Sequence, residues 1–211
     1  VQGLDMGYGD FVVMRDLNFS IGKGDIFVIM GGSGCGKSTL LKVLVGLLNP
    51  LRGKVLYGDT SFWDAPADQQ EAITRGFGIL YQSGALWSSM TLAENVALPL
   101  EQYTRLSPRE VDEIVSFKLA LVGLAGFEMF YPSEISGGMK KRVGLARALQ
   151  LDPEIVLFDE PTTGLDPVMT QDIYDLFAQT QERLGYTAVI VSHDIPQIFA
   201  LADQIILLNK G

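Results

Sequence analysis

The consecutive stretches Asp25-Ile26-Phe27-Val28-Ile29-Met30 and Gly31-Gly32-Ser33-Gly34-Cys35-Gly36-Lys37-Ser38-Thr39 decide the fold of this chain of 211 residues. The first stretch is apolar from its second residue onward and predicts a buried strand, and residues 37–48 predict a largely apolar helix. Between them, Gly31 and Gly36 are separated by four residues and followed by lysine and serine. A strand, a glycine-rich turn and a helix in this order are typical of a phosphate-binding loop.

The residue types in this loop suit an anionic ligand. Glycines allow successive backbone N–H groups to point at phosphate oxygens, and the N-terminus of the following helix adds positive potential. The Lys37 ammonium can reach the β- and γ-phosphates of a nucleotide, and the Ser38 hydroxyl can bind Mg²⁺. The alternative interpretation is a glycine-rich turn that binds nothing. We assign nucleotide binding to Gly31, Gly32, Ser33, Gly34, Cys35, Gly36, Lys37, Ser38 and Thr39.

Short β-branched runs alternate with helix-period stretches along the chain, which predicts an α/β fold with a largely parallel sheet. A section without strand signal, from about residue 83 to 150, predicts a helical insertion. It contains Ser107-Pro108-Arg109-Glu110, which predicts a capped helix start, and another helix is expected after Asp166-Pro167. Beyond residues 25–30, strands are expected over residues 11–21, 54–57, 77–81, 155–158, 188–191 and 204–208.

Two carboxylates and the single histidine follow predicted core strands. Asp159 and Glu160 come directly after the apolar run 155–158, and His193 follows the run 188–191. Parallel sheets bind ligands at the carboxyl ends of their strands. Asp159 is therefore a candidate ligand of Mg²⁺, and Glu160 is a candidate general base that activates water. His193 is a candidate donor of a hydrogen bond to a γ-phosphate. The alternatives are a solvated acidic strand end and a histidine that is structural or merely exposed.

Composition excludes several classes of protein. With 16 Lys+Arg against 25 Asp+Glu, the formal net charge is −9, which argues against generic nucleic-acid binding. A hydrophobic content of 47% and a charged content of 19% exclude intrinsic disorder. No apolar run approaches the roughly 20 residues that a membrane span needs. Because the chain starts at Val1 without a leader and stops just after a strand-like run, we expect it to be part of a longer protein.

A further element, Ile135-Ser136-Gly137-Gly138-Met139-Lys140, lies between the phosphate loop and Asp159-Glu160, and residues 142–148 continue it as Arg-Val-Gly-Leu-Ala-Arg-Ala. With this set, the chain resembles the ATP-binding-cassette (ABC) ATPases along essentially its whole length, although most members have Gln and Leu where Met139 and Ile135 stand. The resemblance implies a P-loop NTPase core of residues 1–82 and 151–211 with an antiparallel β-subdomain. It also implies an inserted helical subdomain over about residues 83–150.

The resemblance further implies individual roles. Tyr8 is similar to the aromatic residue that stacks on adenine, and Gln82 to the glutamine that senses Mg²⁺ and the lytic water and contacts the membrane partner. Ser136, Gly137 and Gly138 resemble the signature that caps the γ-phosphate of ATP held by a second copy, and Asp166 resembles an aspartate at the dimer interface. The implied enzyme is an ATPase that uses ATP and Mg²⁺, with catalytic residues Glu160, His193 and Gln82 and metal ligands Ser38, Gln82 and Asp159.

The Ser136-Gly137-Gly138 signature also favours a dimer on physical grounds. Ser136 with two glycines at a predicted helix N-terminus forms an anion-binding nest, and the phosphate loop already provides one. Two such nests suggest a composite site shared between two chains. ATP would then hold together a head-to-tail dimer with two sites.

Three short segments narrow the resemblance to one branch of the family. Ser-Gly-Gly-Met followed by Lys140-Lys141-Arg142, residues 81–86 and Pro132-Ser133-Glu134 resemble ATPases of lipid transporters that work with MCE-domain proteins, as in the maintenance-of-lipid-asymmetry (Mla) system. This implies a peripheral subunit at the cytoplasmic face of the bacterial inner membrane. The implied partners are permease subunits, an MCE-domain lipid-binding protein and a small accessory subunit. We interpret Lys140-Lys141-Arg142 itself as a solvated basic helix face.

Other functions within the family remain open. The cargo could instead be methionine or a released lipoprotein. An ABC ATPase of DNA repair or translation is disfavoured, because the chain is acidic and has neither a coiled-coil insertion nor a tandem cassette. A nucleotide switch without turnover is disfavoured by Glu160 and His193. The only cysteine, Cys35, cannot form an intramolecular disulfide, and its alkylation is expected to block ATP binding.

Overall fold

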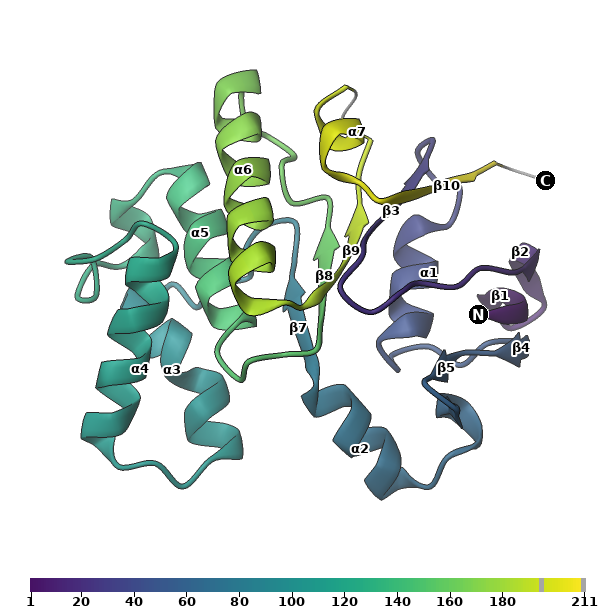
Figure 1. Cartoon of the computed structure of the whole chain (residues 1–211), viewed down its shortest axis with the longest axis horizontal. Helices are drawn as coiled ribbons and strands as arrows, with labels where there is room; N and C mark the ends of the chain where they lie inside the picture. The colour runs from purple at the N-terminus through teal and green to yellow at the C-terminus, as the bar shows by residue number, and fades with distance from the viewer. Residues whose placement is uncertain (194–195, 210–211) are drawn as a thin grey trace.

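The computed structural model describes residues 1–193 and 196–209, and its centre is a five-stranded parallel sheet (Figure 1). The order across the sheet is β10-β3-β9-β8-β7, and every neighbouring pair is parallel. The predicted α/β fold with a largely parallel sheet is therefore confirmed. The strands are β3 (Ile26–Gly31), β7 (Phe77–Leu80), β8 (Ile155–Asp159), β9 (Thr187–Val191) and β10 (Gln204–Leu208).

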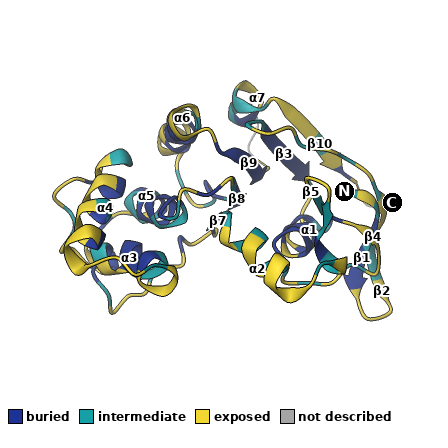
Figure 2. Ribbon diagram, turned by 60° about the horizontal axis from the view of Figure 1, so that its bottom comes forward, coloured by how far each residue is buried: buried dark blue, intermediate teal, exposed yellow. Residues whose placement is uncertain are grey.

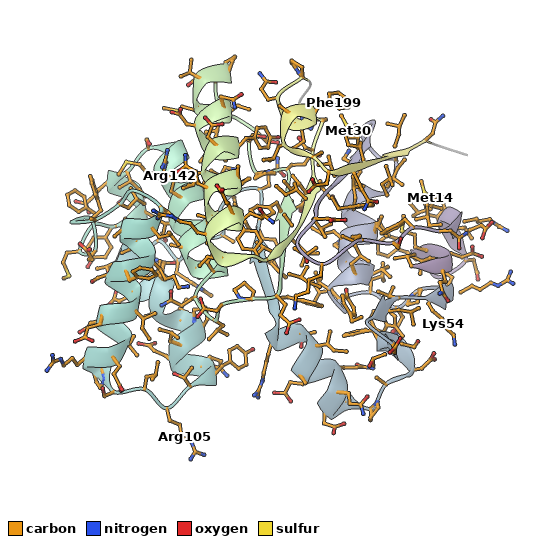
Figure 3. All side chains as sticks on the ribbon, in the orientation of Figure 1. Met14, Met30, Lys54, Arg105, Arg142 and Phe199 are labelled. Atoms are coloured by element: carbon orange, nitrogen blue, oxygen red, sulfur yellow. The ribbon has the colours of Figure 1, made fainter. Side chains whose placement is uncertain are left out.

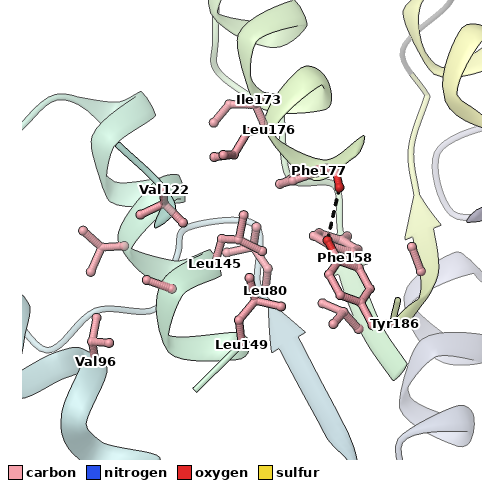
Figure 4. Close-up of a cluster of buried hydrophobic side chains, with 14 of the residues drawn as sticks. Leu80, Val96, Val122, Leu145, Leu149, Phe158, Ile173, Leu176, Phe177 and Tyr186 are labelled. Carbon is pink, nitrogen blue, oxygen red and sulfur yellow. Dashed lines mark hydrogen bonds between the residues drawn. The ribbon is translucent and has the colours of Figure 1, made fainter. Parts of the chain in front are cut away.

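The alternation of residues along β3 explains why helices cover both faces of the sheet. Ile26, Val28 and Met30 lie in one buried cluster with residues of α5 (Gly137–Ala148) and α6 (Pro167–Leu184), whereas Phe27 and Ile29 pack with α1 (Lys37–Leu44). A continuous apolar strand needs two packed faces, because its side chains alternate between them. Figure 2 shows the buried strands between helices with exposed outer faces, and Figure 4 shows part of the first cluster.

A smaller antiparallel sheet packs against α1. Its order is β2-β1-β4, with β1 (Gln2–Tyr8), β2 (Phe11–Leu17) and β4 (Arg52–Lys54). Leu4 and Met6 of β1 are fully buried in the cluster that includes α1. The sequence did not predict β1, and the strand expected over residues 11–21 ends at Leu17. The next elements along the chain are β5 (Leu56–Tyr57), β6 (Thr60–Ser61), the 3-10 turn Phe62–Asp64 and α2 (Ala67–Arg75).

The chain between β7 and β8 is helical. It forms α3 (Leu92–Tyr103), α4 (Pro108–Leu121), the 3-10 turn Pro132–Glu134 and α5. The start of α4 follows the predicted capping box, because Glu110 N–H donates to the Ser107 hydroxyl and Ser107 N–H donates to the Glu110 carboxylate. The short α7 (Gln197–Leu201) lies between β9 and β10. Among the helices of residues 1–193 and 196–209, none combines the length and the hydrophobicity required to cross a bilayer.

Candidate functional site

The phosphate-binding loop joins the carboxyl end of β3 to α1. Gly36 is the N-cap of α1 and has φ 106°, a left-handed conformation that L-residues rarely adopt. A Cβ at this position would also lie 2.7 Å from Cγ1 of Val13 on β2. Only glycine satisfies both constraints, so the close approach of β2 to the loop depends on Gly36.

The loop curls around the Lys37 ammonium. Nζ of Lys37 donates hydrogen bonds to the carbonyl oxygens of Gly31 at 2.9 Å and Gly32 at 3.2 Å, and the side chain is only 6% exposed. The cleft above it has a volume of ≈ 750 Å³ and is lined by residues 31–39 together with Phe11, Val13, Glu160 and His193. A buried ammonium beside a glycine-rich turn at a helix N-terminus fits the phosphates of a nucleotide.

Glu160 occupies the centre of the charged groups in this cleft. Its Oε1 lies 3.7 Å from Lys37 Nζ and 3.7 Å from His193 Nδ1, and Thr163 Oγ1 donates to its Oε2 at 3.3 Å. Its backbone has φ 45°, which is left-handed and strained for a residue with a side chain. The structure thus brings together Lys37, Glu160 and His193, which the sequence predicted at the ends of three different strands.

Asp159 lies directly beside Glu160 at the end of β8. Burial raises the pKa of the Asp159 carboxyl above its usual value, the Glu160 charge raises it further, and Lys37 and Lys42 oppose this. Two adjacent carboxylates at a half-buried strand end are stabilised by a cation. The Ser38 hydroxyl lines the cleft and Asp159 does not, and both supply oxygen donors of the kind that Mg²⁺ prefers together with phosphate oxygens.

Gln82 lies outside this cleft, in the loop that follows β7 (residues 81–86, hereafter the Gln82 loop). Its side chain is exposed, but its carbonyl oxygen accepts a hydrogen bond from Nζ of Lys141 on α5. Arg147, also on α5, donates to the carbonyl oxygens of Gly84 at 2.7 Å and Ala85 at 2.8 Å. The helix that begins at the signature is thus bonded to the Gln82 loop at two points.

These contacts correct the interpretation of Lys140-Lys141-Arg142 as a solvated basic face. Lys141 is only 5% exposed, and burial lowers the pKa of its ammonium. Arg142, labelled in Figure 3, donates to the carbonyl oxygen of Val122 at the C-cap of α4. Helical spacing could not reveal these partners, because they are main-chain oxygens of other segments.

The signature residues Ser136, Gly137 and Gly138 begin α5 and do not line the cleft that Lys37 and Glu160 share. Ser136 is the N-cap, its hydroxyl accepts from Met139 N–H, and both Ser136 and Gly137 are exposed. Asp166 is likewise an exposed N-cap, bonded to the N–H groups of Val168 and Met169 on α6. Within one chain Ser136 and Asp166 therefore cap helices, and Ser136 and Gly137 are exposed at the start of α5, whereas Gly138 is buried.

Tyr8 and Cys35 differ in exposure: Tyr8 is exposed and Cys35 is buried. A side-chain hydrogen bond with Thr39 lowers the pKa of Tyr8, and Lys42 Nζ lies 5.9 Å from the centroid of its ring. The Tyr8 ring is 47% exposed beside α1 and is available for stacking. The Cys35 side chain is 3% exposed and belongs to the buried cluster under the loop, so only its backbone faces the cleft.

Four residues that shape this region are not predicted from the sequence. Phe11 and Val13 line the cleft from β2, and Lys141 and Arg147 hold the Gln82 loop. The first two were detectable as same-face residues of a predicted strand. The last two had no signal beyond their charge.

The chain is similar to several known proteins. Residues 14–163 match the sequence model of a family described as ABC transporter. The "Probable ribonucleotide transport ATP-binding protein mkl" of Mycobacterium tuberculosis (strain ATCC 25618 / H37Rv) is 45% identical over 210 residues, which are 100% of this chain and 58% of that protein. The "Intermembrane phospholipid transport system ATP-binding protein MlaF" of Haemophilus influenzae is 40% identical over 96% of this chain and 77% of its own length.

Solved structures show the same fold. The dimeric structure of a bacterial ABC transporter cassette has a TM-score of 0.88 and 32% identity, covering 100% of this chain and 94% of that one. A dimeric post-hydrolysis state of an ATP-binding cassette, bound to ADP and Pi, has a TM-score of 0.87 with the same identity and coverage.

Proposed function

Because the chain belongs to the ABC transporter family, we propose that it is the ATP-binding and ATP-hydrolysing part of a transporter. The chain spans 58% of the length of its mkl relatives, so the activity, substrates and partners of the whole protein are all part of the proposal. In this proposal, residues 1–82 and 151–211 form the nucleotide-binding core. Residues 83–150 form the helical subdomain that contacts the membrane partner.

One arrangement carries the proposal: Glu160 Oε1 lies 3.7 Å from both Lys37 Nζ and His193 Nδ1 in a single cleft lined by the phosphate loop. Backbone N–H groups of the loop bind the phosphates, and Lys37 exchanges its loop carbonyls for β- and γ-phosphate oxygens. Glu160 orients the attacking water and accepts its proton, while His193 donates a hydrogen bond to the γ-phosphate. The products are ADP and inorganic phosphate.

The residues that would hold Mg²⁺ are Ser38, Asp159 and Gln82, of which Gln82 lies outside the cleft. When bound, the ion would supply neutralisation of the phosphate charge. The stacking residue for adenine is Tyr8, which is exposed beside α1.

A second copy of the chain completes the site in this proposal. Ser136 and Gly137 are exposed, and Gly138 is buried, at a helix N-terminus that lies outside the chain's own cleft, and such an N-terminus binds anions. Facing the phosphate loop of a partner, it caps the γ-phosphate there, with Asp166 at the interface. Two cassettes of the same fold are dimeric, which supports a second copy as the partner.

An exposed aromatic patch next to the Gln82 loop supports a membrane partner. Trp87, Met129, Phe130 and Tyr131 are 63%, 76%, 39% and 43% exposed. Hydrogen bonds join both of their segments to α3: Leu92 N–H donates to the Phe130 carbonyl, and Trp87 N–H donates to the Asn95 side chain. Apolar patches of this kind mark protein interfaces. We therefore place the permease here, which makes the protein peripheral at the cytoplasmic face of the bacterial inner membrane.

The cargo that we favour is phospholipid, from the MlaF relatives, with an MCE-domain lipid-binding protein and a small accessory subunit completing the complex. The name of the mkl relatives supplies the second candidate, a ribonucleotide. The two chemistries differ enough for one experiment to separate them.

That experiment uses the native complex, purified through a tag on the full-length protein and reconstituted into phospholipid vesicles. We expect Mg²⁺-dependent phosphate release, its loss in Lys37→Ala, and ATP-dependent movement of a fluorescent phospholipid. Movement of labelled ribonucleotide in place of lipid would show that the cargo is a ribonucleotide. Absence of phosphate release from the wild-type complex would refute the ATPase itself.

A further inference from the structure

Three buried hydroxyl groups form a chain beside the candidate site. Tyr174 Oη lies 3.2 Å from Thr162 Oγ1 and 2.9 Å from Ser192 Oγ, both hydrogen-bonding distances. The exposed fractions of Thr162, Tyr174 and Ser192 are 4%, 1% and 1%. Tyr174 belongs to α6, so one helical side chain connects two loops that follow different strands of the central sheet.

These two loops carry Glu160 and His193. Thr162 follows Glu160 by two residues, and Ser192 directly precedes His193. Main-chain bonds join the same strand ends: Glu160 N–H donates to the Val191 carbonyl at 2.9 Å, and Ser192 N–H donates to the Ile29 carbonyl at 3.2 Å. The hydroxyl chain therefore runs parallel to backbone bonds that link β3, β8 and β9 where they form the cleft.

The segment that Tyr174 holds on one side is strained. Glu160 has φ 45°, and a non-glycine residue keeps such a conformation only when its surroundings fix it. A hydrogen bond to Thr162, two residues later, restrains the chain where it would otherwise relax. Inside a protein such bonds are strong, and their geometry restrains the groups that they join.

We propose that Tyr174 is a positioning residue for hydrolysis: its hydroxyl fixes the spacing between the loops after β8 and β9, and thereby holds Glu160 and His193 in register over the γ-phosphate. The inference rests on the proposed ATPase function. Tyr174 is buried on α6 and does not line the cleft, so it acts through Thr162 and Ser192.

The test compares two Tyr→Phe variants of the full-length protein. Tyr174→Phe removes the hydroxyl and keeps the ring, whose centroid lies 6.1 Å from that of Phe177. Tyr186→Phe is the matched control, because Tyr186 is 2% exposed and its hydroxyl bonds to Thr180 and to the Phe177 carbonyl, the dashed line in Figure 4. Neither of these partners belongs to a strand-end loop.

We expect both variants to lose similar thermal stability, whereas Tyr174→Phe alone lowers kcat, by about three- to tenfold, with KM for MgATP unchanged. Ser192→Ala should also lower kcat, and in the double variant the two losses should be less than additive, because both substitutions remove the Tyr174–Ser192 bond. Equal kcat losses in Tyr174→Phe and Tyr186→Phe, or additive losses in the double variant, would overturn the inference.

Failure of the inference is separable from failure of the proposed function. If the wild type releases phosphate and the two Tyr→Phe variants have equal kcat, only the positioning role of Tyr174 is refuted. If the wild type releases no phosphate, the proposed ATPase activity is refuted. If Tyr174→Phe does not fold, as judged by circular dichroism, Ser192→Ala replaces it. A lower kcat with unchanged KM in Ser192→Ala then supports the positioning role, and an unchanged kcat refutes it.

Discussion

Nζ of Lys141 donates a hydrogen bond to the carbonyl oxygen of Gln82, a residue 59 positions earlier in the chain. Lys141 lies in the helix that begins at Gly137, so the bond ties the candidate γ-phosphate cap to the loop that faces the proposed permease. A movement of α5 must therefore either carry the Gln82 loop with it or break this bond.

Lys141→Met should weaken the coupling between α5 and the Gln82 loop. The apolar stem keeps its packing, while the Gln82 carbonyl turns to solvent, which the exposed loop allows. We expect steady-state hydrolysis to fall by about three- to tenfold with nucleotide affinity retained. Lys140→Met, next to it on the same helix, is the control and should hydrolyse ATP normally. Equal rates in the two variants would show that the Lys141 bond is not used in the cycle.

Glu160→Gln should separate binding from hydrolysis. The amide keeps an oxygen for the Thr163 hydroxyl but cannot accept the proton of the attacking water. We expect hydrolysis to fall about 100-fold or more, with ATP bound normally and the dimer persisting in size-exclusion chromatography. Glu154→Gln, at the opposite end of β8 and exposed, is the control. Full activity in Glu160→Gln would remove this residue from the role of base.

Gly137→Asp should block the second half of the composite site and leave the fold intact. A Cβ at Gly137 meets nothing closer than Leu165 Cδ2 at 3.9 Å, and an acid in the first turn of a helix is favourable. The same charge repels the γ-phosphate of a partner's ATP. We expect hydrolysis to fall about 100-fold while the monomer binds nucleotide unchanged. Ala67→Asp, which also puts an acid at an exposed helix N-terminus, should have no effect on hydrolysis.

Asp159→Asn should stabilise the nucleotide-free protein at neutral pH. Burial and the Glu160 charge raise the pKa of Asp159 in the folded protein above its value in the unfolded chain. At neutral pH the folded protein therefore carries the cost of a charged, half-buried carboxylate. This cost decreases as the pH falls through the folded pKa. The variant should therefore unfold at a higher temperature than the wild type at about pH 7.5, by a few degrees, and the difference should shrink at about pH 4. A destabilised variant at neutral pH would mean that Asp159 is held by favourable contacts in the fold.

The sequence predicted the parts of the site that depend on strand order. It did not predict contacts that a single side chain makes with a segment distant in the chain. Glu160 and His193 could be placed together because the carboxyl ends of parallel strands share one edge. The strand β1 escaped prediction, because Gly3 and Gly7 interrupt its pattern and its pairing with β2 and β4 supplies the bonds. The burial of Lys141 could not be foreseen, since only the folded Gln82 loop provides its acceptor.

Cys35 provides a test of the loop itself. Its position among phosphate-binding residues predicts that alkylation blocks ATP binding, but the thiol is 3% exposed and packed in the cluster that contains Leu40 and Ile29. We therefore expect the native protein to react with a maleimide only slowly, at the rate at which the loop opens, and nucleotide to slow the reaction further. Cys35→Ala should bind ATP normally, because the loop uses only the backbone of this residue. Fast labelling of the folded, nucleotide-free protein would show that the thiol lies at the surface of the loop instead.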